Sequence, residues 1–240
     1  MQNQTNLKVN RTELKFLISN NEYISLFEKL KHILDKDIHS RKGKGYFIRS
    51  LYFDSHNDKC LFEKQGGIML RKKFRMRIYD FDCKEAKFEI KNRLNNHIFK
   101  ETATITRSSA INIIKGNYEE LLKYNNELLN RIYTTFNLGN YKPKVVIDYY
   151  RDAFKLDLCN TRITVDKNIE ANNANPNIFS KNLHTIPIMS PKKNVLEIKY
   201  DKVLPEFLKL ILQLNSFEKF SFSKYVLSRR LLKKFSWEDN

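Results

Sequence analysis

Basic residues recur at every second position in several short segments of this chain. The clearest run is Lys73, Arg75 and Arg77, separated by Phe74 and Met76. Guanidinium and ammonium groups in such a row can hold several phosphate oxygens at once, because each group donates more than one charged hydrogen bond. The pattern indicates binding of a polyanion. It also suits phosphoryl transfer, which depends mainly on positioning and charge neutralisation.

The charged side of this alternation is more basic than the chain as a whole. It holds twelve Lys or Arg residues against four Asp or Glu, whereas the whole chain has 44 against 27. A solvated face normally mixes both signs, so the excess indicates an anionic ligand. This charged stripe consists of Arg11, Glu13, Lys15, Lys73, Arg75, Arg77, Lys87, Glu89, Lys91, Arg93, Lys100, Arg151, Arg162, Asp166, Glu197 and Lys199.

A period of two predicts β-strands with one apolar and one charged face. The predicted strands span residues 11–18, 46–54, 71–79, 86–93, 97–106, 145–154, 162–169 and 195–200. Turn-like residues join the strands between 71 and 106, so these three should form an antiparallel meander.

Helices are predicted between these strands. The first follows residue 18, with Asn20 or Asn21 as its N-cap and apolar residues at helical spacing after it. Further helices are predicted over 57–64, 108–115, 118–136, 205–214 and 224–235. The Asn-rich segment 168–182 is interpreted as a surface loop.

Eight strands are enough to close a barrel whose interior holds one small ligand. The alternative is a sheet whose polar face lies in water. With amphipathic helices available for the apolar faces, we expect an α+β fold: an antiparallel β-barrel tunnel of about eight strands with a charged basic interior. Like charges in that interior are tolerable only where anions and water fill it. We expect one domain over residues 1–240, with a core at about 11–231.

Composition narrows the class of protein. The net charge of +17 and the pI near 9.7 favour an anionic partner, and the alternative is a charge that only aids solubility. Three cysteines without paired spacing argue for a reducing compartment, without a disulfide framework or zinc site. No apolar run approaches the ~18 residues of a membrane span, and the N-terminus lacks a signal core. These features predict a cytoplasmic protein.

An ordered set of short motifs resembles a known family. The motifs are Arg75-Met76-Arg77, Glu89-Ile90-Lys91, Lys100-Glu101, Tyr149-Tyr150-Arg151, Arg162-Ile163-Thr164, Glu197-Ile198-Lys199 and Ser223-Lys224-Tyr225, with Glu13, Lys15 and Leu51-Tyr52-Phe53-Asp54. Together they closely resemble the catalytic domain of the vacuolar transporter chaperone (VTC) polyphosphate polymerases. That group belongs to the CYTH-like triphosphate tunnel metalloenzymes, with thiamine triphosphatases, some RNA triphosphatases and CYTH-type adenylate cyclases. The resemblance covers residues 11–231.

The resemblance implies a function and a set of site residues. The expected enzyme binds ATP with a divalent metal, usually Mn²⁺ with Mg²⁺ as the alternative, and moves the γ-phosphate onto a polyphosphate chain. The implied catalytic contacts are Arg75, Arg77, Lys91, Lys100, Arg151, Arg162 and Lys224; further phosphate contacts are Lys15, Lys199 and Ser223. Tyr149 would lie near the nucleotide, and Glu197 would be the metal ligand because hard cations prefer carboxylate oxygens.

The chain departs from the hydrolytic branches at both carboxylate positions. Those branches usually begin with a Glu-x-Glu-x-Lys strand and end with paired glutamates, where this chain has Arg11-x-Glu13-x-Lys15 and Glu197-x-Lys199. Fewer carboxylates and more cations favour the polymerase. For Glu13 and Glu89 we favour pairing with neighbouring cations over metal ligation.

Two other functions stay open. One is a tunnel-type triphosphatase that releases phosphate, and the other is a non-catalytic polyphosphate-binding module. Nucleic acid is disfavoured, because the residues interleaved with the basic ones face the opposite side, where they cannot stack on bases. Eukaryotic relatives work beside membrane subunits, and we expect any membrane association of this chain to come through a partner or a basic surface. The acceptor, the product length and the oligomeric state stay open.

Overall fold

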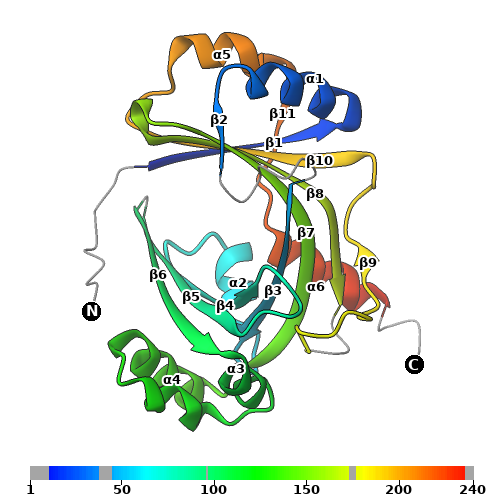
Figure 1. Ribbon diagram of the computed structural model, residues 1–240. Coiled ribbons are helices and arrows are strands. Elements are labelled where there is room, and N and C mark those ends of the chain that lie inside the picture. Colours follow the sequence, from blue (N-terminus) through cyan, green and yellow to red (C-terminus); the bar gives the residue numbers. More distant parts are fainter. Residues whose placement is uncertain (1–10, 38–44, 96, 173–176, 236–240) are drawn as a thin grey trace. The chain divides into compact units, whose positions relative to one another are not determined.

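The computed structural model describes residues 11–37, 45–95, 97–172 and 177–235. The chain forms two compact units (Figure 1). Unit 1 comprises Met1–Phe47, Tyr149–Ile169 and Met189–Ser223; unit 2 comprises Ile48–Asp148, Glu170–Ile188 and Lys224–Asn240. Strands β3 (Tyr46–Asp54), β7 (Lys142–Leu156) and β8 (Thr161–Asn172) each begin in one unit and end in the other. The single domain over 1–240 stays a prediction.

Unit 1 is built around three antiparallel strands. Strand β1 (Arg11–Ser19) pairs with β10 (Lys193–Asp201), and β10 pairs with β8. The register sets Lys15 opposite Glu197, and Glu197 opposite Thr164. Directly opposed residues share a face, so these charged side chains lie on one side of the sheet. The two-residue strands β2 (Asp35–Lys36) and β11 (Glu218–Lys219) add short pairs with β7 and β1.

The apolar side of these strands forms the core of unit 1. Helices α1 (Asn20–Lys31) and α5 (Glu206–Leu212) lie over it (Figure 1). The buried cluster consists of Phe16, Ile18, Leu26, Leu30, Leu34, Phe154, Ile163, Val165, Leu196, Ile198, Leu204, Leu208 and Leu212. Burial of one face leaves the charged stripe on the other. Short 3₁₀ turns, η3 (Leu158–Asn160) and η4 (Leu214–Ser216), complete the unit.

Unit 2 contains the predicted meander. Strands β4 (Leu70–Ile78), β5 (Glu85–Leu94) and β6 (His97–Thr106) pair antiparallel in sequence order, and β3 pairs with β4. Tyr52, Arg75, Glu89 and Thr102 lie directly opposite one another across the four strands. The meander and the 97–106 strand are confirmed.

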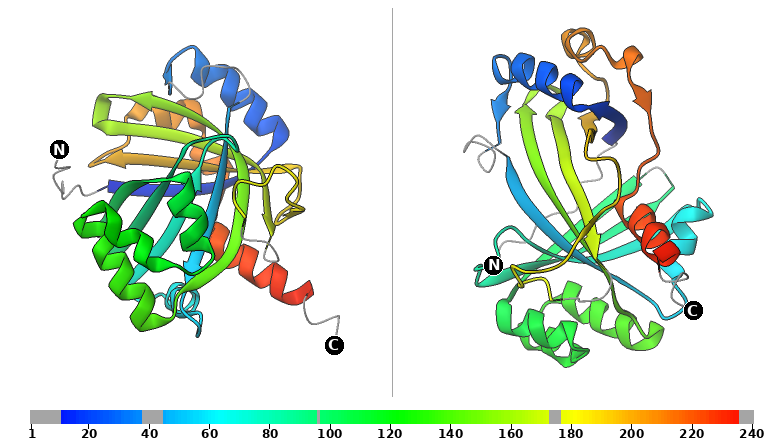
Figure 2. Two further views of the ribbon diagram at one scale, coloured as in Figure 1. Left: turned by 60° about the horizontal axis from the view of Figure 1, so that its bottom comes forward. Right: turned by 90° about the vertical axis from the view of Figure 1, so that its right-hand side faces the viewer.

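The other face of the meander is apolar. Phe74, Met76 and Phe88 are fully buried there, beneath α3 (Arg107–Ile114), the 3₁₀ helix η2 (Tyr118–Tyr124) and α4 (Glu127–Gly139). Helix α6 (Lys224–Phe235) lies beside α2 (Lys59–Gln65), as the right-hand view of Figure 2 shows. Helices α3, η2 and α4 thus cover the apolar face of the meander and leave its charged face uncovered by them.

Three local predictions are wrong. The N-cap of α1 is Ser19, whose hydroxyl accepts from the backbone N–H of Glu22, and not Asn20 or Asn21. The predicted 118–136 helix is two helices, because Asn125 is left-handed with φ 43° and ends η2.

The third error concerns the Asn-rich loop. Strand β8 continues to Asn172, and Glu170 and Ala171 pair with β9 (Ile186–Pro187). Residues 173–176 of the predicted loop lie outside the described residues. The eight predicted strands are all present, and every register that the structure gives is antiparallel. Across the described ranges, no helix combines the length and the apolar character needed to span a membrane.

Candidate functional site

The charged face of the unit 2 meander gathers one group of predicted site residues. Because their register partners share a face, we call this set the Arg75 face. It consists of Ser50, Tyr52, Lys73, Arg75, Arg77, Lys87, Glu89, Lys91 and Lys100. Arg77 is buried, whereas the side chain of Lys100 is 46% exposed. The face thus extends from the sheet interior to solvent.

Glu89 is the carboxylate at the centre of this face. It pairs with the Arg75 guanidinium, its Oε1 lies 2.5 Å from Lys100 Nζ, and Arg77 Nη1 is 3.7 Å away. Burial alone would raise the pKa of Glu89, but Arg75, Arg77 and Lys100 outweigh it and lower this pKa to about 2. The expected pairing of Glu89 is present. Three cations share one carboxylate, so the cluster keeps a positive surplus.

A row of lysines crosses the same strands. Lys73 lies opposite Lys91, and Lys91 lies opposite Lys100. Like charges directly opposite each other destabilise a sheet unless a counter-charge lies near. Burial lowers the pKa of Lys100, and Arg75 and Arg77 lower it further, against the opposing effect of Glu89. A bound polyanion would relieve this repulsion.

Helix α6 carries Lys224 at its first position and is anchored within unit 2. The hydroxyl of Tyr225 donates to Asp54 Oδ2 at 2.5 Å, and Arg229 Nη2 donates to Asp58 Oδ2 at 2.6 Å. Asp54 also accepts the backbone N–H groups of Ser55, just after β3, and of Cys60 and Leu61 at the start of α2. This network fixes the start of α6, and with it Lys224.

The charged face of unit 1 gathers the second group. We call it the Glu197 face; it consists of Glu13, Lys15, Arg151, Arg162, Thr164, Asp166, Glu197 and Lys199. Lys15 Nζ lies 2.7 Å from Glu13 Oε1 and 3.8 Å from Glu197 Oε2, and Lys199 also pairs with Glu197. Burial would lower the pKa of Lys15, but Glu197 and Glu13 outweigh it and raise this pKa.

Arg151 is held by a buried partner. Its Nε and Nη2 donate to the two oxygens of Asp166 at 2.6 and 2.8 Å, and its guanidinium lies 5.3 Å from the ring centroid of Tyr149. Burial opposes the charge of Arg151, but Asp166 outweighs it and raises the pKa of Arg151 well above its usual value. Tyr149 is only 3% exposed, so its predicted contact with a nucleotide has little open ring surface.

Two polar atoms of this face lack hydrogen-bond partners within the described ranges. They are Arg162 Nε and Thr164 Oγ1, both buried. Arg162 Nη2 meanwhile donates to Asp37 Oδ2 at 2.8 Å. Buried polar atoms are almost always satisfied, so unsatisfied ones mark places where a ligand or water would bind.

The donors of the Glu197 face fit a divalent cation. Mg²⁺ is usually held by one or two carboxylates, with substrate phosphates and water completing its oxygen ligands. Glu197 and Glu13 could supply the carboxylates, and the unsatisfied hydroxyl of Thr164 adds an oxygen. Lys15 would compete with the cation for both carboxylates. Among the described residues, no group of three or more His, Cys, Asp or Glu could hold a metal ion alone.

The predicted site residues therefore fall into two sets. Arg75, Arg77, Lys91, Lys100 and Lys224 belong to unit 2; Lys15, Tyr149, Arg151, Arg162, Glu197, Lys199 and Ser223 belong to unit 1. Sequence reasoning missed Tyr52 and Thr164. Period two would have revealed both, since Tyr52 alternates with the buried Leu51 and Phe53, and Thr164 with Ile163 and Val165.

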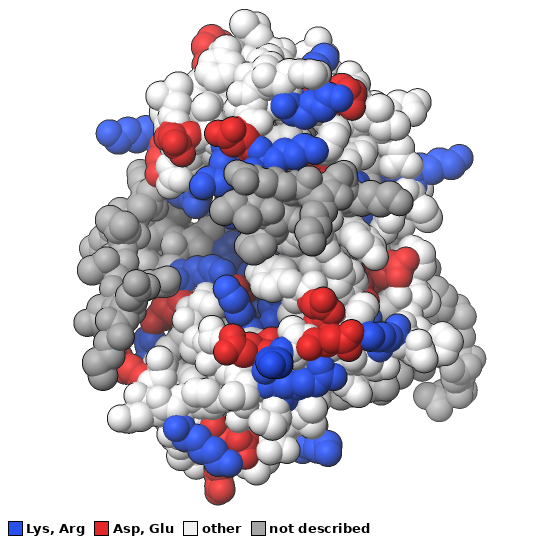
Figure 3. All heavy atoms as spheres, in the orientation of Figure 1, with Lys and Arg blue, Asp and Glu red and all other residues white. Residues whose placement is uncertain are grey.

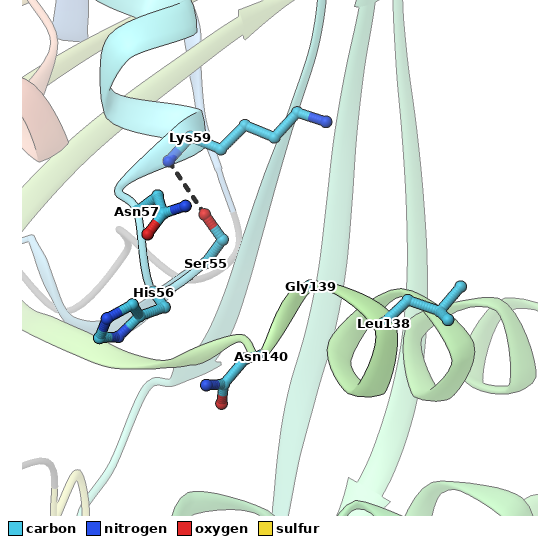
Figure 4. Close-up of a pocket in the computed structure, with 7 residues that line it drawn as sticks. All are labelled: Ser55, His56, Asn57, Lys59, Leu138, Gly139 and Asn140. Atoms are coloured by element: carbon cyan, nitrogen blue, oxygen red, sulfur yellow. Dashed lines mark hydrogen bonds between the residues drawn. The ribbon is translucent and has the colours of Figure 1, made fainter.

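Two other surface features are less suited to phosphate. On the face shown in Figure 3, Lys and Arg side chains often lie beside Asp and Glu, so part of the positive charge on this face is balanced by neighbouring carboxylates. A pocket of about 670 Å³ in unit 2 is lined by Ser55, His56, Asn57, Lys59, Leu138, Gly139 and Asn140 (Figure 4). Lys59 is its only Lys or Arg, and it extends away from Ser55, so the pocket lacks a basic cluster.

Comparison with known families gives a match over nearly the whole chain. The model described as the VTC domain matches residues 10–233.

Solved structures share the fold. A putative adenylyl cyclase from Hippeastrum, described as having a dominant triphosphatase activity, is 15% identical with a TM-score of 0.56, over 93% of this chain and 96% of that one. A putative adenylate cyclase from Bacillus halodurans is 14% identical with a TM-score of 0.51, over 91% and 94%. The chain shares the antiparallel α+β fold of these two structures, as predicted. The strand pairings of the described residues do not close the sheet, so the predicted closed tunnel stays an expectation.

One curated protein matches part of the chain. Human 1-phosphatidylinositol 4,5-bisphosphate phosphodiesterase gamma-2 is 32% identical over 128 residues, which is 51% of this chain and 9% of that protein. The chain thus spans about a tenth of that relative's length.

Proposed function

Because this chain belongs to the VTC domain family, we propose that it is a polyphosphate polymerase that moves the γ-phosphate of ATP onto a polyphosphate chain. The observation that carries the proposal is the surplus of cations on the Arg75 face. Three cations share Glu89, and a row of lysines lies beside them. A long phosphate chain carries repeated negative charge, which matches a face on which Lys and Arg residues outnumber carboxylates.

Phosphoryl transfer requires little covalent catalysis by protein side chains. Phosphoryl transfer proceeds through a state with charge spread over the transferred phosphate oxygens, and positioned cations stabilise that charge. In the proposal Arg75 and Arg77 bind phosphate oxygens, and Lys91, Lys100 and Lys224 extend the cationic track. Glu89 holds the two guanidinium groups and Lys100 in place between turnovers.

The Glu197 face would hold the divalent cation, proposed as Mn²⁺ with Mg²⁺ as the alternative. Such a cation would supply positive charge that neutralises the phosphate groups during transfer. Glu197 would be its protein ligand, with Glu13 as the weaker candidate, while Lys15 and Lys199 hold these carboxylates in its absence. Arg151, Arg162 and Ser223 are proposed phosphate contacts, and Tyr149 is the proposed nucleotide contact. The proposal places the enzyme in the cytoplasm, with any membrane contact made through a partner.

A tunnel-type triphosphatase is the second candidate. The observation that favours it is the fold shared with the Hippeastrum protein, whose description names a triphosphatase activity. Both candidates need triphosphate and metal, and they differ in the acceptor: a phosphate chain for the polymerase and water for the triphosphatase. A polyphosphate-binding module without catalysis is the third outcome.

Product analysis separates these functions. The purified protein is incubated with ATP and Mn²⁺, and the products are resolved on a polyacrylamide gel and assayed for free phosphate. A ladder of long chains is expected. Free phosphate without a ladder would establish the triphosphatase, and unchanged ATP would leave only binding.

A matched pair of variants connects the product to the Arg75 face. Arg75→Ala should abolish the ladder, because it removes a charged donor worth roughly 1.5–3 kcal/mol. Arg131→Ala is the control, since Arg131 lies on α4 with its side chain 49% exposed and outside both faces. Near-normal turnover of a folded Arg75→Ala protein would contradict the proposal.

A further inference from the structure

Tyr52 lies within the Arg75 face, although the sequence around it is apolar. Its neighbours Leu51 and Phe53 are buried in the opposite, core side of the sheet. Tyr52 lies directly across from Arg75 and is 8% exposed. The phenol therefore belongs to the basic face.

The hydroxyl of Tyr52 has an incomplete set of partners. It accepts a hydrogen bond from Arg75 Nη1 at 3.5 Å. Within the described part of the chain, no acceptor for its own hydrogen is found. The charged groups that face it are the cations Arg75, Arg77 and Lys224, which cannot accept. A buried phenol usually finds a partner for its O–H, so this donor is oriented for an acceptor that the described residues do not supply.

The ring of Tyr52 is fixed from the other side by α6. It stacks on Tyr225 with centroids 5.3 Å apart and an interplanar angle of 25°. The Tyr225 hydroxyl in turn donates to Asp54 and accepts from Arg229 Nη1 at 3.0 Å. Tyr52 is thus held where its oxygen borders the cations, and little conformational entropy would be lost on binding a ligand.

The electrostatics agree with this geometry. Burial alone would raise the pKa of Tyr52, but Arg75, Arg77 and Lys224 outweigh it and lower this pKa below its usual value. A more acidic phenol is a stronger hydrogen-bond donor to an anion.

We propose that Tyr52 binds the phosphate chain directly, by donating its phenolic hydrogen to a phosphate oxygen held by Arg75 and Arg77. The inference rests on the proposed function and adds a neutral donor to its cationic contacts. Tyr225 is the positioning residue that fixes the Tyr52 ring.

Tripolyphosphate binding to the full chain is the test. Tyr52→Phe keeps the ring and its stacking on Tyr225 but removes the hydroxyl. Calorimetry should show tripolyphosphate affinity weakened by roughly tenfold or more, as expected for the loss of one hydrogen bond to a charged group. The melting temperature of the ligand-free variant should equal that of the wild type. Tyr150→Phe is the matched control, because Tyr150 is 44% exposed and outside both faces.

A spectroscopic titration separates a ligand contact from a packing role. Phosphate bound at the hydroxyl should raise the pKa of Tyr52, because it stabilises the protonated phenol and repels the phenolate. Tripolyphosphate should therefore shift one tyrosinate absorbance step to higher pH in the wild type. That shift should be missing from Tyr52→Phe and present in Tyr150→Phe.

The outcomes distinguish this inference from the proposed function. If Arg75→Ala loses tripolyphosphate binding while Tyr52→Phe keeps wild-type affinity and the tyrosinate shift, the role of Tyr52 is overturned and the basic site stands. If both variants bind as the wild type does, the Arg75 face is not the phosphate site, and the proposed function fails with it.

Discussion

Two carboxylates on basic faces differ in what surrounds them. Glu89 contacts two guanidinium groups and an ammonium, whereas Glu197 contacts the ammonium groups of Lys15 and Lys199. A planar guanidinium loses less conformational freedom for each hydrogen bond it forms than a flexible lysine does. Glu197 can therefore exchange its partners for a metal ion more easily than Glu89 can.

At Glu197 we predict a loss of catalysis without a loss of binding. Glu197→Gln keeps the shape and removes the charge, so turnover should fall roughly a hundredfold or more if the carboxylate holds the cation. Metal-free tripolyphosphate affinity should persist or rise, because a repelling charge has gone. The measurements are turnover at saturating Mn²⁺ and calorimetry with a chelator. Glu206→Gln is the control, because Glu206 lies on α5 with its side chain 74% exposed and outside both faces. Turnover of the variant within a few-fold of the wild type would show that Glu197 pairs with lysines and does not hold the metal ion.

At Glu89 we predict a pH-dependent stability. The folded pKa is about 2 and the ordinary value is 4.5, so stability is fully present above about pH 5 and is lost as the pH falls toward 2. This difference in pKa corresponds to a contribution of about 3 kcal/mol to the free energy of unfolding. Denaturant unfolding between pH 6 and pH 3 should show a smaller slope of unfolding free energy against pH for Glu89→Gln than for the wild type. Identical slopes would show that the three cations do not hold Glu89 ionised.

Among the elements, the start of α1 depends on one serine. Ser19 and Glu22 form a reciprocal capping box. Ser19→Ala should lower the free energy of unfolding by about 1 kcal/mol. Asn21→Ala should change it by much less, because Asn21 is exposed inside the first turn. Equal effects of the two substitutions in urea denaturation would contradict the assignment of Ser19 as the N-cap.

The alternation predicted the strands well because it reports burial of one face directly. Segment 97–106 is correct to the residue, and the charged stripe shares a face within each unit. Two of the three errors involve asparagines with a left-handed backbone. Asn125 is left-handed and divides a segment whose apolar period continues, and Asn168, with φ 47°, lies inside a strand that composition marked as loop. Neither conformation is encoded in a hydrophobic period.

The sequence predicted which charged residues share the candidate site, but not which side chains they pair with. Spacing identified Arg75, Arg77 and Lys100 as residues of one charged face, but only the cross-strand register shows that they share Glu89. Tyr52 was missed because an aromatic residue between Leu51 and Phe53 suggests core. Its contact with Arg75 depends on long-range pairing of β3 with β4, which a local pattern does not contain.

For the whole molecule, the net charge of +17 makes anion binding measurable as stability. A ligand that binds only the folded state stabilises it by about 2.7 kcal/mol at 100 times its dissociation constant. For a chain of 150–250 residues this raises the melting temperature by roughly 5–10 °C. We predict such a rise with tripolyphosphate at low salt.

Salt and a double variant determine whether built sites or diffuse charge cause the rise. Exposed charges are screened beyond ~10 Å at 0.1 M salt, so diffuse binding should lose nearly all of its effect there, whereas the Arg75 face, where Glu89 is 1% exposed and Arg77 6%, should keep most of it. Arg75→Ala with Arg77→Ala should abolish the rise and leave the ligand-free protein folded by circular dichroism. A negligible rise in the wild type at low salt, or a full rise in the double variant, would mean that the basic stripe is only solvated surface charge, and the polymerase proposal would lose its physical basis.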